Sequence, residues 1–171
     1  MELIKALIRD VPDFPKPGIL FKDITPMLKD PAAFARVIEL LKDRAAGRGV
    51  EAIVGMESRG FIFGAPLALA MELPFIPVRK AGKLPAVTEK VSYSLEYGEA
   101  TLEIHRDALR PGQKVLIIDD LLATGGTALA TIELVERLGG VVVACSFVIE
   151  LSFLDGARNL PEGIVDSLIT F

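Results

Sequence analysis

The chain lacks the features that mark secreted, membrane-bound or disulfide-bonded proteins. It has one cysteine in 171 residues, which excludes an internal disulfide bond. No apolar run is long enough to span a membrane, and the first ten residues, MELIKALIRD, are too short and too charged for a signal peptide. We therefore expect a cytoplasmic protein, with its single thiol, Cys145, buried in a strand.

Positive charge is also scarce. The chain has 19 basic and 23 acidic residues, a net charge of −4 and a sequence pI near 5.1. This balance argues against a general nucleic-acid or membrane-surface binder, so an anionic substrate must be bound by local groups of basic residues. There is no internal repeat and no low-complexity tract. A hydrophobic content of 51% predicts one domain, residues 1–171, with a proper core.

Two familiar nucleotide-binding motifs are missing. No Gly-x-Gly-x-x-Gly occurs anywhere in the chain. Residues 55–60, GMESRG, have the glycine spacing of a P-loop, but Phe61 follows them where that motif requires lysine. The sequence therefore predicts neither a dinucleotide-binding fingerprint nor a P-loop.

The most informative stretch is residues 115–127, VLIIDDLLATGGT. Its first four residues are all apolar, which is typical of a parallel strand covered on both faces. Asp119 and Asp120 stand where that strand is expected to end. The turn from Ala123 to Thr127 offers glycines and a helix start that suit a phosphate, whereas the carboxylates suit sugar hydroxyls or a divalent cation. A ribose phosphate satisfies both, although an ordinary strand–turn–helix with capping residues is the alternative.

The rest of the chain alternates between strands and helices. Expected helices are 31–46, about 60–71 and 127–138, the last burying Leu129, Ile132 and Val135. Expected strands are 52–54, 75–78, 141–149 and 164–171. This alternation predicts an α/β fold with a mainly parallel central sheet flanked by helices. The carboxyl ends of its strands should bring together residues 55–59, 79–80 and 119–120 on one rim.

Two segments stand outside this pattern. Residues 1–30 contain a short helical stretch and then three prolines between positions 12 and 17, which predict a stiff, extended segment. The apolar stretch that follows, residues 19–26, by composition alone favours an edge strand or packing arm. Residues 82–98 contain no core element, although 91–95 and 100–104 alternate as the two strands of a hairpin would. A long segment of this kind is often a lid.

Residues 115–127 resemble the phosphoribosyl-pyrophosphate (PRPP) signature of type I phosphoribosyltransferases, in which two acids precede a T-G-G-T loop. Further matches narrow the resemblance to the adenine phosphoribosyltransferases and cover nearly the whole chain in order. They are ESRGF (57–61), RK (79–80), GKLP (82–85), SYSLEYG (92–98) and FKDITP (21–26). The resemblance implies the type I phosphoribosyltransferase fold, with residues 1–30 as a small hood over a purine and 82–98 as a flexible catalytic lid.

The reaction implied by the resemblance belongs to purine salvage: adenine and PRPP give AMP and pyrophosphate through an oxocarbenium-like ribosyl transfer. The implied catalytic residues are Glu96 and Arg59. The implied PRPP-binding residues are Glu57, Ser58, Arg59, Arg79, Lys80, Lys83, Asp119, Asp120, Ala123, Thr124, Gly125, Gly126 and Thr127. The implied adenine-binding residues are Leu20, Phe21, Lys22 and Leu121, with Lys22 standing where some relatives carry arginine.

The implied cofactor is Mg²⁺, held mainly by PRPP, with Asp119 and Asp120 as candidate protein ligands. The implied assembly is a homodimer. Two other functions remain open at this point: a phosphoribosyltransferase for another base, such as xanthine or orotate, and a non-catalytic regulator that senses PRPP. A regulator of this kind normally needs added DNA-binding helices or a basic face. The acidic balance of this chain argues against a basic face.

Overall fold

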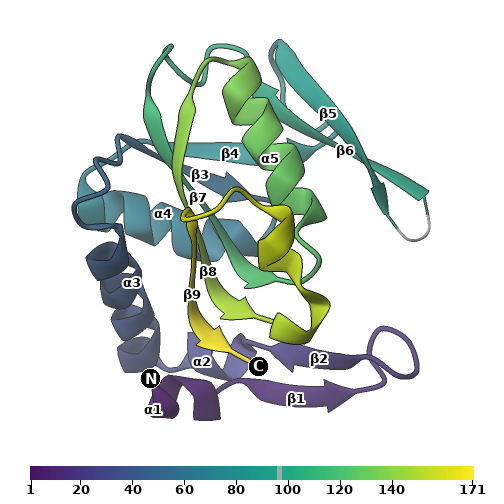
Figure 1. Cartoon of the computed structure of the whole chain (residues 1–171). Coiled ribbons are helices and arrows are strands. Elements are labelled where there is room, and N and C mark those ends of the chain that lie inside the picture. Colours follow the sequence, from purple (N-terminus) through teal and green to yellow (C-terminus); the bar gives the residue numbers. More distant parts are fainter. Residues whose placement is uncertain (96–97) are drawn as a thin grey trace. The chain divides into compact units, whose positions relative to one another are not determined.

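The computed structural model describes residues 1–95 and 98–171. The chain forms two compact units, residues 1–40 and residues 41–171. The first contains the segment predicted to be a hood, and the second contains the predicted sheet. Figure 1 labels the helices and strands of both units.

An antiparallel hairpin is the main feature of the first unit. The elements are, in chain order, α1 (Glu2–Ala6), β1 (Arg9–Pro12), β2 (Leu20–Asp23) and α2 (Thr25–Lys29). β1 and β2 pair with Arg9 opposite Asp23, and the guanidinium and carboxylate of these two residues lie 2.5 Å apart. Between the strands, the Gly18 N–H donates to the Asp13 carboxylate at 2.7 Å. The proline-rich segment is therefore the loop end of a hairpin.

A long helix, α3 (Pro31–Ala45), follows as predicted. The Asp30 carboxylate accepts hydrogen bonds of 3.0 Å from the backbone N–H groups of Ala32 and Ala33. These bonds satisfy two donors that the first turn of a helix leaves without intrahelical partners. Asp30 is thus the N-cap, and Pro31 occupies the first helical position, where its missing N–H costs nothing.

A seven-stranded sheet forms the second unit. Its elements are β3 (Ala52–Met56), α4 (Arg59–Met71), β4 (Phe75–Lys80), β5 (Thr88–Leu95), β6 (Gly98–His105), β7 (Lys114–Leu122), α5 (Gly126–Arg137), β8 (Val141–Glu150), two 3₁₀ turns, η1 (Ser152–Leu154) and η2 (Gly156–Asn159), and β9 (Val165–Thr170). The strand order is β5-β6-β4-β3-β7-β8-β9. The five strands from β4 to β9 in this order are parallel, and β5 and β6 form an antiparallel hairpin at one edge. The predicted fold class is confirmed.

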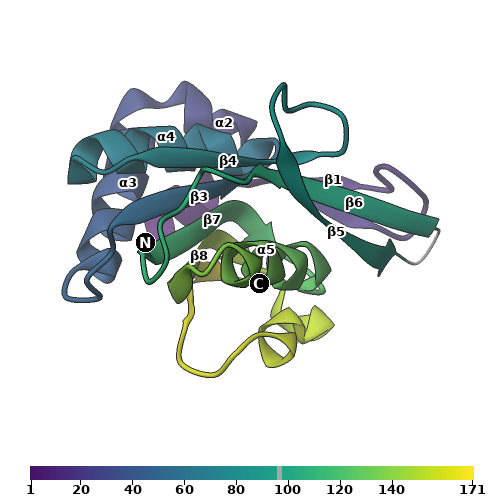
Figure 2. The ribbon, with the colours of Figure 1, turned by 90° about the horizontal axis from the view of Figure 1, so that it is seen from above.

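Helices α4 and α5 cover opposite faces of the sheet, as Figure 2 shows from above. Side chains alternate between these faces along each strand. Ile117 belongs to the cluster that includes Ile132 and Val135 of α5. On the other face, Gly64 lets α4 approach closely, because a Cβ there would lie 3.0 Å from the Ile118 side chain. Residues 115–118 are fully buried, as predicted for a strand covered on both faces.

Strand β7 is longer than the sequence predicted. Asp119 and Asp120 lie inside it, two residues before its end at Leu122. The strand continues because β8 is ten residues long and keeps pairing with it, up to Leu122 opposite Glu150. Paired strand residues therefore precede and follow the two acids in the chain. This pairing restricts the backbone of the acids more than a loop would.

The predicted burial of Leu129 is wrong, since this side chain is 46% exposed. The buried face of α5 instead follows Ala128, Thr131 and Val135, at i, i+3 and i+7. Leu129 lies about 100° further around the helix than Ala128 and so falls outside that face.

The single thiol of the chain lies in a strand, as predicted. Cys145 is fully buried in β8, and burial raises the pKa of its thiol to about 12. It therefore remains a neutral thiol at physiological pH. Among residues 1–95 and 98–171, no helix combines the length and apolarity needed to cross a membrane.

Candidate active site

A cavity of about 210 Å³ opens at the carboxyl end of the parallel strands. Its lining consists of Met56, Arg59, Phe147 and every residue from 119 to 128. These residues come from β3, β7 and β8, from the turn between β7 and α5, and from the first turns of α4 and α5. Ligands of open α/β sheets bind outside the carboxyl ends of the strands. The structure thus brings Arg59 together with the two acids and the glycine-rich turn, as the sequence predicted.

The turn between β7 and α5 presents backbone N–H groups to this cavity. α5 begins at Gly126, and Gly125 has a φ of +85°, which glycine adopts without strain. In the described chain no side chain caps this helix, so the N–H groups of its first turn are left for a ligand. All five residues from 123 to 127 line the cavity. We call residues 123–127 the phosphate loop, because the helix start favours an anion.

The two acids sit beside the phosphate loop in a dry environment. The Asp119 carboxylate accepts a 2.8 Å hydrogen bond from the Asp120 N–H, and the Asp120 side chain is only 2% exposed. Burial, and then the neighbouring charge of Asp120, raises the pKa of Asp119 well above its usual range. Burial also raises the pKa of Asp120, against the effect of Arg59, whose Nε lies 3.0 Å from the carboxylate. Hydrogen bonds from ligand hydroxyls, or a nearby cation, would stabilise the ionised form of these two carboxylates.

The basic residues at the end of β4 are organised around Glu57. The Glu57 side chain is 6% exposed and accepts hydrogen bonds from Lys83 Nζ at 2.6 Å, the Lys80 N–H at 2.9 Å and Arg79 Nε at 3.3 Å. The residue lies just beyond β3, and its peptide bond to Ser58, the N-cap position of α4, is cis. The carboxylate thus holds two cations and a backbone donor in one cluster, which we call the basic cluster.

A second cavity, of about 510 Å³, adjoins the basic cluster and the β5–β6 hairpin. Glu57, Lys80, Tyr93 and Thr127 are among its lining residues. The Tyr93 hydroxyl lies 3.1 Å from Thr127 Oγ1, which ties the hairpin to the phosphate loop. Because Thr127 also lines the first cavity, an extended ligand with an anionic group at each end could occupy both.

Comparisons with known proteins agree with this geometry. The phosphoribosyl transferase domain model matches residues 25–159. The adenine phosphoribosyltransferase of Trichlorobacter lovleyi is 52% identical over 171 residues and matches over the full length of both chains. The chain belongs to the adenine phosphoribosyltransferase family. A crystal structure of the family member from Thermoanaerobacter pseudethanolicus superposes with a TM-score of 0.97, at 55% identity and 99% coverage of both chains.

A more distant family member was solved with ligands. The enzyme from Saccharomyces cerevisiae, complexed with adenine and an imino-altritol bisphosphate, has a TM-score of 0.94 at 42% identity. The alignment covers 98% of this chain and 97% of the yeast chain. The likeness to members of this family therefore extends over both compact units.

The residues expected to bind adenine fall in different places. Leu121 lines the first cavity. Leu20, Phe21 and Lys22 lie on β2 of the first unit. There Phe21 packs edge-to-face against Phe14, with ring centroids 5.1 Å apart, and Lys22 Nζ lies 2.6 Å from the Asp10 carboxylate. The expected catalytic residue Glu96 lies outside the described residues.

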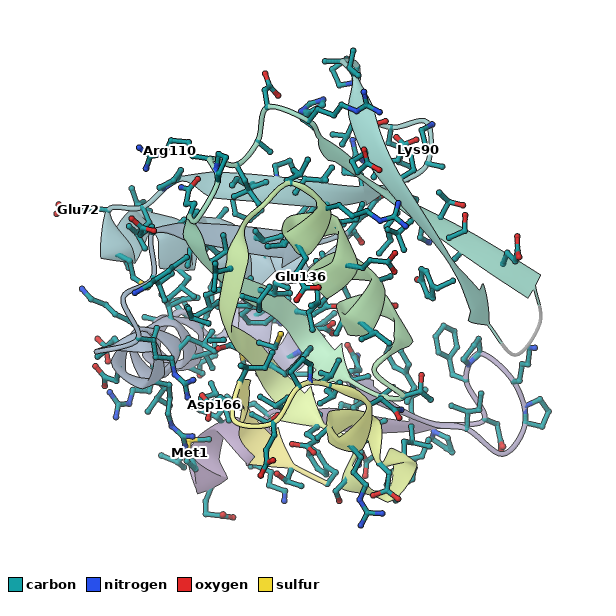
Figure 3. All side chains as sticks on the ribbon, turned by 45° about the horizontal axis from the view of Figure 1, so that its top comes forward. Met1, Glu72, Lys90, Arg110, Glu136 and Asp166 are labelled. Carbon is teal, nitrogen blue, oxygen red and sulfur yellow. The ribbon has the colours of Figure 1, made fainter. Side chains whose placement is uncertain are left out.

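Sequence reasoning missed a buried carboxylate that binds the first residue of the predicted lid. Glu103 on β6 is 1% exposed, accepts a hydrogen bond from the Gly82 N–H at 3.1 Å and lies 2.6 Å from Lys90 Nζ. Figure 3 labels Lys90 on the neighbouring strand β5. The Lys90 bond lowers the pKa of Glu103 despite its burial. The cross-strand register, with Glu103 opposite Lys90, is the signal that reveals this pairing.

Glu57→Gln should lower the free energy of unfolding by about 2 kcal/mol at pH 7, because it weakens three donor contacts to a buried carboxylate. Burial alone would raise the pKa of Glu57, but the bonds from Lys83, Lys80 and Arg79 lower this pKa from 4.5 to about 2. A lowered folded-state pKa means that this stabilisation is complete above about pH 4.5 and is lost as the pH falls toward 2. Urea unfolding at several pH values measures it.

Glu162→Gln is the matched control, since Glu162 is exposed and has no ion pair among the described residues. Its unfolding free energy should stay within about 0.5 kcal/mol of the parent at every pH. A Glu57→Gln deficit that does not shrink between pH 5 and pH 3 would show that the carboxylate does not stabilise the fold through its charge.

Proposed function

We propose that this protein catalyses transfer of the 5-phosphoribosyl group of PRPP to adenine, releasing pyrophosphate and forming AMP. One observation carries the proposal: the phosphate loop, the buried acid pair and the basic cluster surround two cavities that share Thr127. PRPP is a ribose with a phosphate at one end and a pyrophosphate at the other. Its three parts match these three groups in chemistry.

We assign the 5′-phosphate to the phosphate loop and the ribose hydroxyls to the acid pair. The loop offers the N–H groups of a helix start together with the hydroxyls of Thr124 and Thr127. Asp119 and Asp120 accept hydrogen bonds from hydroxyl donors, and these bonds are strong because the acceptor is charged and shielded from water. A ligand hydroxyl also compensates for the cost of burying these carboxylates.

We assign the pyrophosphate to Arg59, Arg79, Lys80 and Lys83, together with the backbone from Glu57 to Arg59. Arginine presents a planar fork to phosphate oxygens, and lysine presents a point charge. Pyrophosphate gains negative charge as its bond to the ribose breaks, so preorganised cations stabilise the transition state more than the ground state. Glu57 would fix the positions of Arg79 and Lys83 without contacting the ligand through its own carboxylate.

The ribose carbon gains positive charge as the leaving group departs. The negative field of Asp119 and Asp120 would stabilise that charge. Water would compete with adenine for such a centre, so closure of the lid, residues 82–98, would protect it. Glu96 lies on that lid, and we propose that it assists proton transfer at the purine. Adenine would be bound by Leu20, Phe21, Lys22 and Leu121.

Magnesium is the metal that the family implies. Among the described residues no group of three or more His, Cys, Asp or Glu side chains could hold a metal ion, and one acid of the pair already faces Arg59. This donor set fits an ion bound mainly by phosphate oxygens and water, with Asp119 or Asp120 as the protein's contribution. Bound in this way, Mg²⁺ would neutralise charge on the leaving pyrophosphate.

A homodimer and a cytoplasmic location are further parts of the proposal. The homodimer rests on the resemblance to the adenine phosphoribosyltransferases, and the cytoplasmic location rests on the single buried cysteine. The acidic balance supports neither a nucleic-acid nor a membrane partner.

The decisive experiment measures pyrophosphate release from PRPP and Mg²⁺ with adenine, hypoxanthine, guanine, xanthine and orotate supplied separately. We expect turnover with adenine. Turnover with another base instead would keep the phosphate and pyrophosphate assignments and remove those of Leu20, Phe21 and Lys22. Binding of PRPP without turnover on any base would favour a PRPP-sensing regulator.

A further inference from the structure

The back of the phosphate loop rests on η2 (Gly156–Asn159), a 3₁₀ turn that follows β8. This turn and the loop are about thirty residues apart in sequence, and two kinds of contact join them. One is a side-chain hydrogen bond from Asn159, and the other is a close approach of the two backbones at Gly156. Neither residue lines the cavity that the loop faces.

The Asn159 side chain fixes the orientation of one peptide group in the loop. Its amide Nδ2 donates to the Thr124 carbonyl oxygen at 2.9 Å. The peptide between Thr124 and Gly125 is planar, so its N–H points opposite to its C=O. Holding the carbonyl against Asn159 therefore keeps the Gly125 N–H pointing away from the Asn159 side chain. If this peptide flipped, a carbonyl oxygen would replace a donor in the loop, and an anion would be repelled.

The approach at Gly156 leaves no room for a side chain. A Cβ on Gly156 would lie 2.0 Å from the Ala123 carbonyl oxygen, and a Cβ on Gly125 would lie 2.7 Å from the Gly156 carbonyl oxygen. Two glycines thus let the backbones touch where Asn159 makes its bond. The loop is backed by packed main chain on the side away from the cavity, which limits the conformations that Gly125 would otherwise sample.

We propose that Asn159 is a positioning residue for the phosphate loop: it orients the Thr124–Gly125 peptide so that the loop is preorganised for a sugar 5′-phosphate. The inference rests on the proposed function of residues 123–127. Preorganisation raises affinity by removing the cost of ordering the loop at binding. Asn159 contacts no substrate and acts only through the phosphate loop. Its replacement should therefore weaken binding of the phosphorylated ligand and leave binding of the base unchanged.

The test measures the Kd of ribose 5-phosphate by calorimetry for Asn159→Ala and Asn159→Asp. We expect both values to rise about ten-fold, the size of one lost hydrogen bond. The KM for PRPP should rise in parallel, while the KM for adenine stays within about two-fold of the parent value. The kcat should be nearly unchanged, because the lost interaction contributes equally to the ground state and the transition state. Asn159→Asp keeps the shape of the side chain but has no donor at neutral pH.

Arg158→Ala is the charge-matched control. It changes the charge by the same amount as Asn159→Asp, at the next residue, and the Arg158 side chain is 82% exposed. Its Kd for ribose 5-phosphate should stay within about two-fold of the parent. An unchanged Kd in Asn159→Ala, or equal rises in the KM values for adenine and PRPP, would overturn the proposal, because the second result marks a general disturbance of the fold.

A further variant separates this inference from the assignment on which it rests. Thr127→Val removes a hydroxyl of the phosphate loop itself. If Thr127→Val weakens ribose 5-phosphate binding and Asn159→Ala does not, the loop binds phosphate and only the positioning role fails. If the parent protein itself does not bind ribose 5-phosphate, the phosphate assignment of residues 123–127 fails, and the inference falls with it.

Discussion

Replacing both Asp119 and Asp120 with asparagine is expected to raise the Kd for PRPP about a hundred-fold. Each carboxylate should accept a ribose hydroxyl, and a hydrogen bond to a charged, shielded acceptor contributes roughly 1.5–3 kcal/mol. Asparagine keeps the shape and one acceptor oxygen but loses the charge, so the estimate lies at the lower end for two such bonds. Titration calorimetry with PRPP and Mg²⁺ measures the change.

The matched control is Asp43→Asn with Asp107→Asn, which removes the same two charges at exposed positions of the described chain. Its PRPP affinity should differ from the parent by less than about three-fold, since distant exposed charges are screened by salt. An unchanged Kd in the Asp119→Asn, Asp120→Asn variant would mean that the acids face something other than the ribose. A loss equal in both double variants would assign the effect to net charge.

Much of the fold could be predicted from the sequence, because the pattern of residues within each short stretch agrees with how that stretch packs in the structure. Residues 115–118 are uniformly apolar, and they form the buried centre of a parallel sheet. Asp30 and Pro31 predict a helix start, and the carboxylate caps that helix in the structure. The T-G-G-T turn predicts a helix N-terminus facing a ligand, and residues 123–127 line the cavity. In each case one short stretch carries the whole signal.

Features set by partners distant in sequence were not readable. The length of β7 depends on how far β8 pairs with it, and periodicity in residues 115–122 does not encode that partner. Glu57 is predicted to bind PRPP, but its side chain reaches cations that lie 22 and 26 residues away. The bond from Asn159 to Thr124 spans 35 residues. Polar pairing of this kind depends on tertiary geometry, which hydrophobic spacing does not specify.

The second large effect is expected at Arg59, which lines the first cavity beside the acid pair and is assigned to the pyrophosphate. Arg59→Ala should lower kcat/KM for PRPP by about 10²- to 10³-fold, the usual cost of losing one preorganised charge at a developing anion. The same change leaves the Asp120 carboxylate, 2% exposed, without the cation 3.0 Å away. Steady-state pyrophosphate release with adenine as the base measures the loss.

The pH dependence of PRPP binding separates these two roles of Arg59. Arg59 opposes the effect of burial on the pKa of Asp120, so its removal should raise that pKa further. If an acid must be ionised to accept hydrogen bonds from the ribose hydroxyls, the affinity for PRPP falls as the pH falls through the pKa of that acid. The Kd for PRPP in Arg59→Ala should therefore begin to rise at a higher pH than in the parent. Arg110→Ala, exposed in the loop before β7 and labelled in Figure 3, should leave the profile unchanged. Parallel profiles in Arg59→Ala and the parent would confine Arg59 to the pyrophosphate and remove its influence on the acid pair.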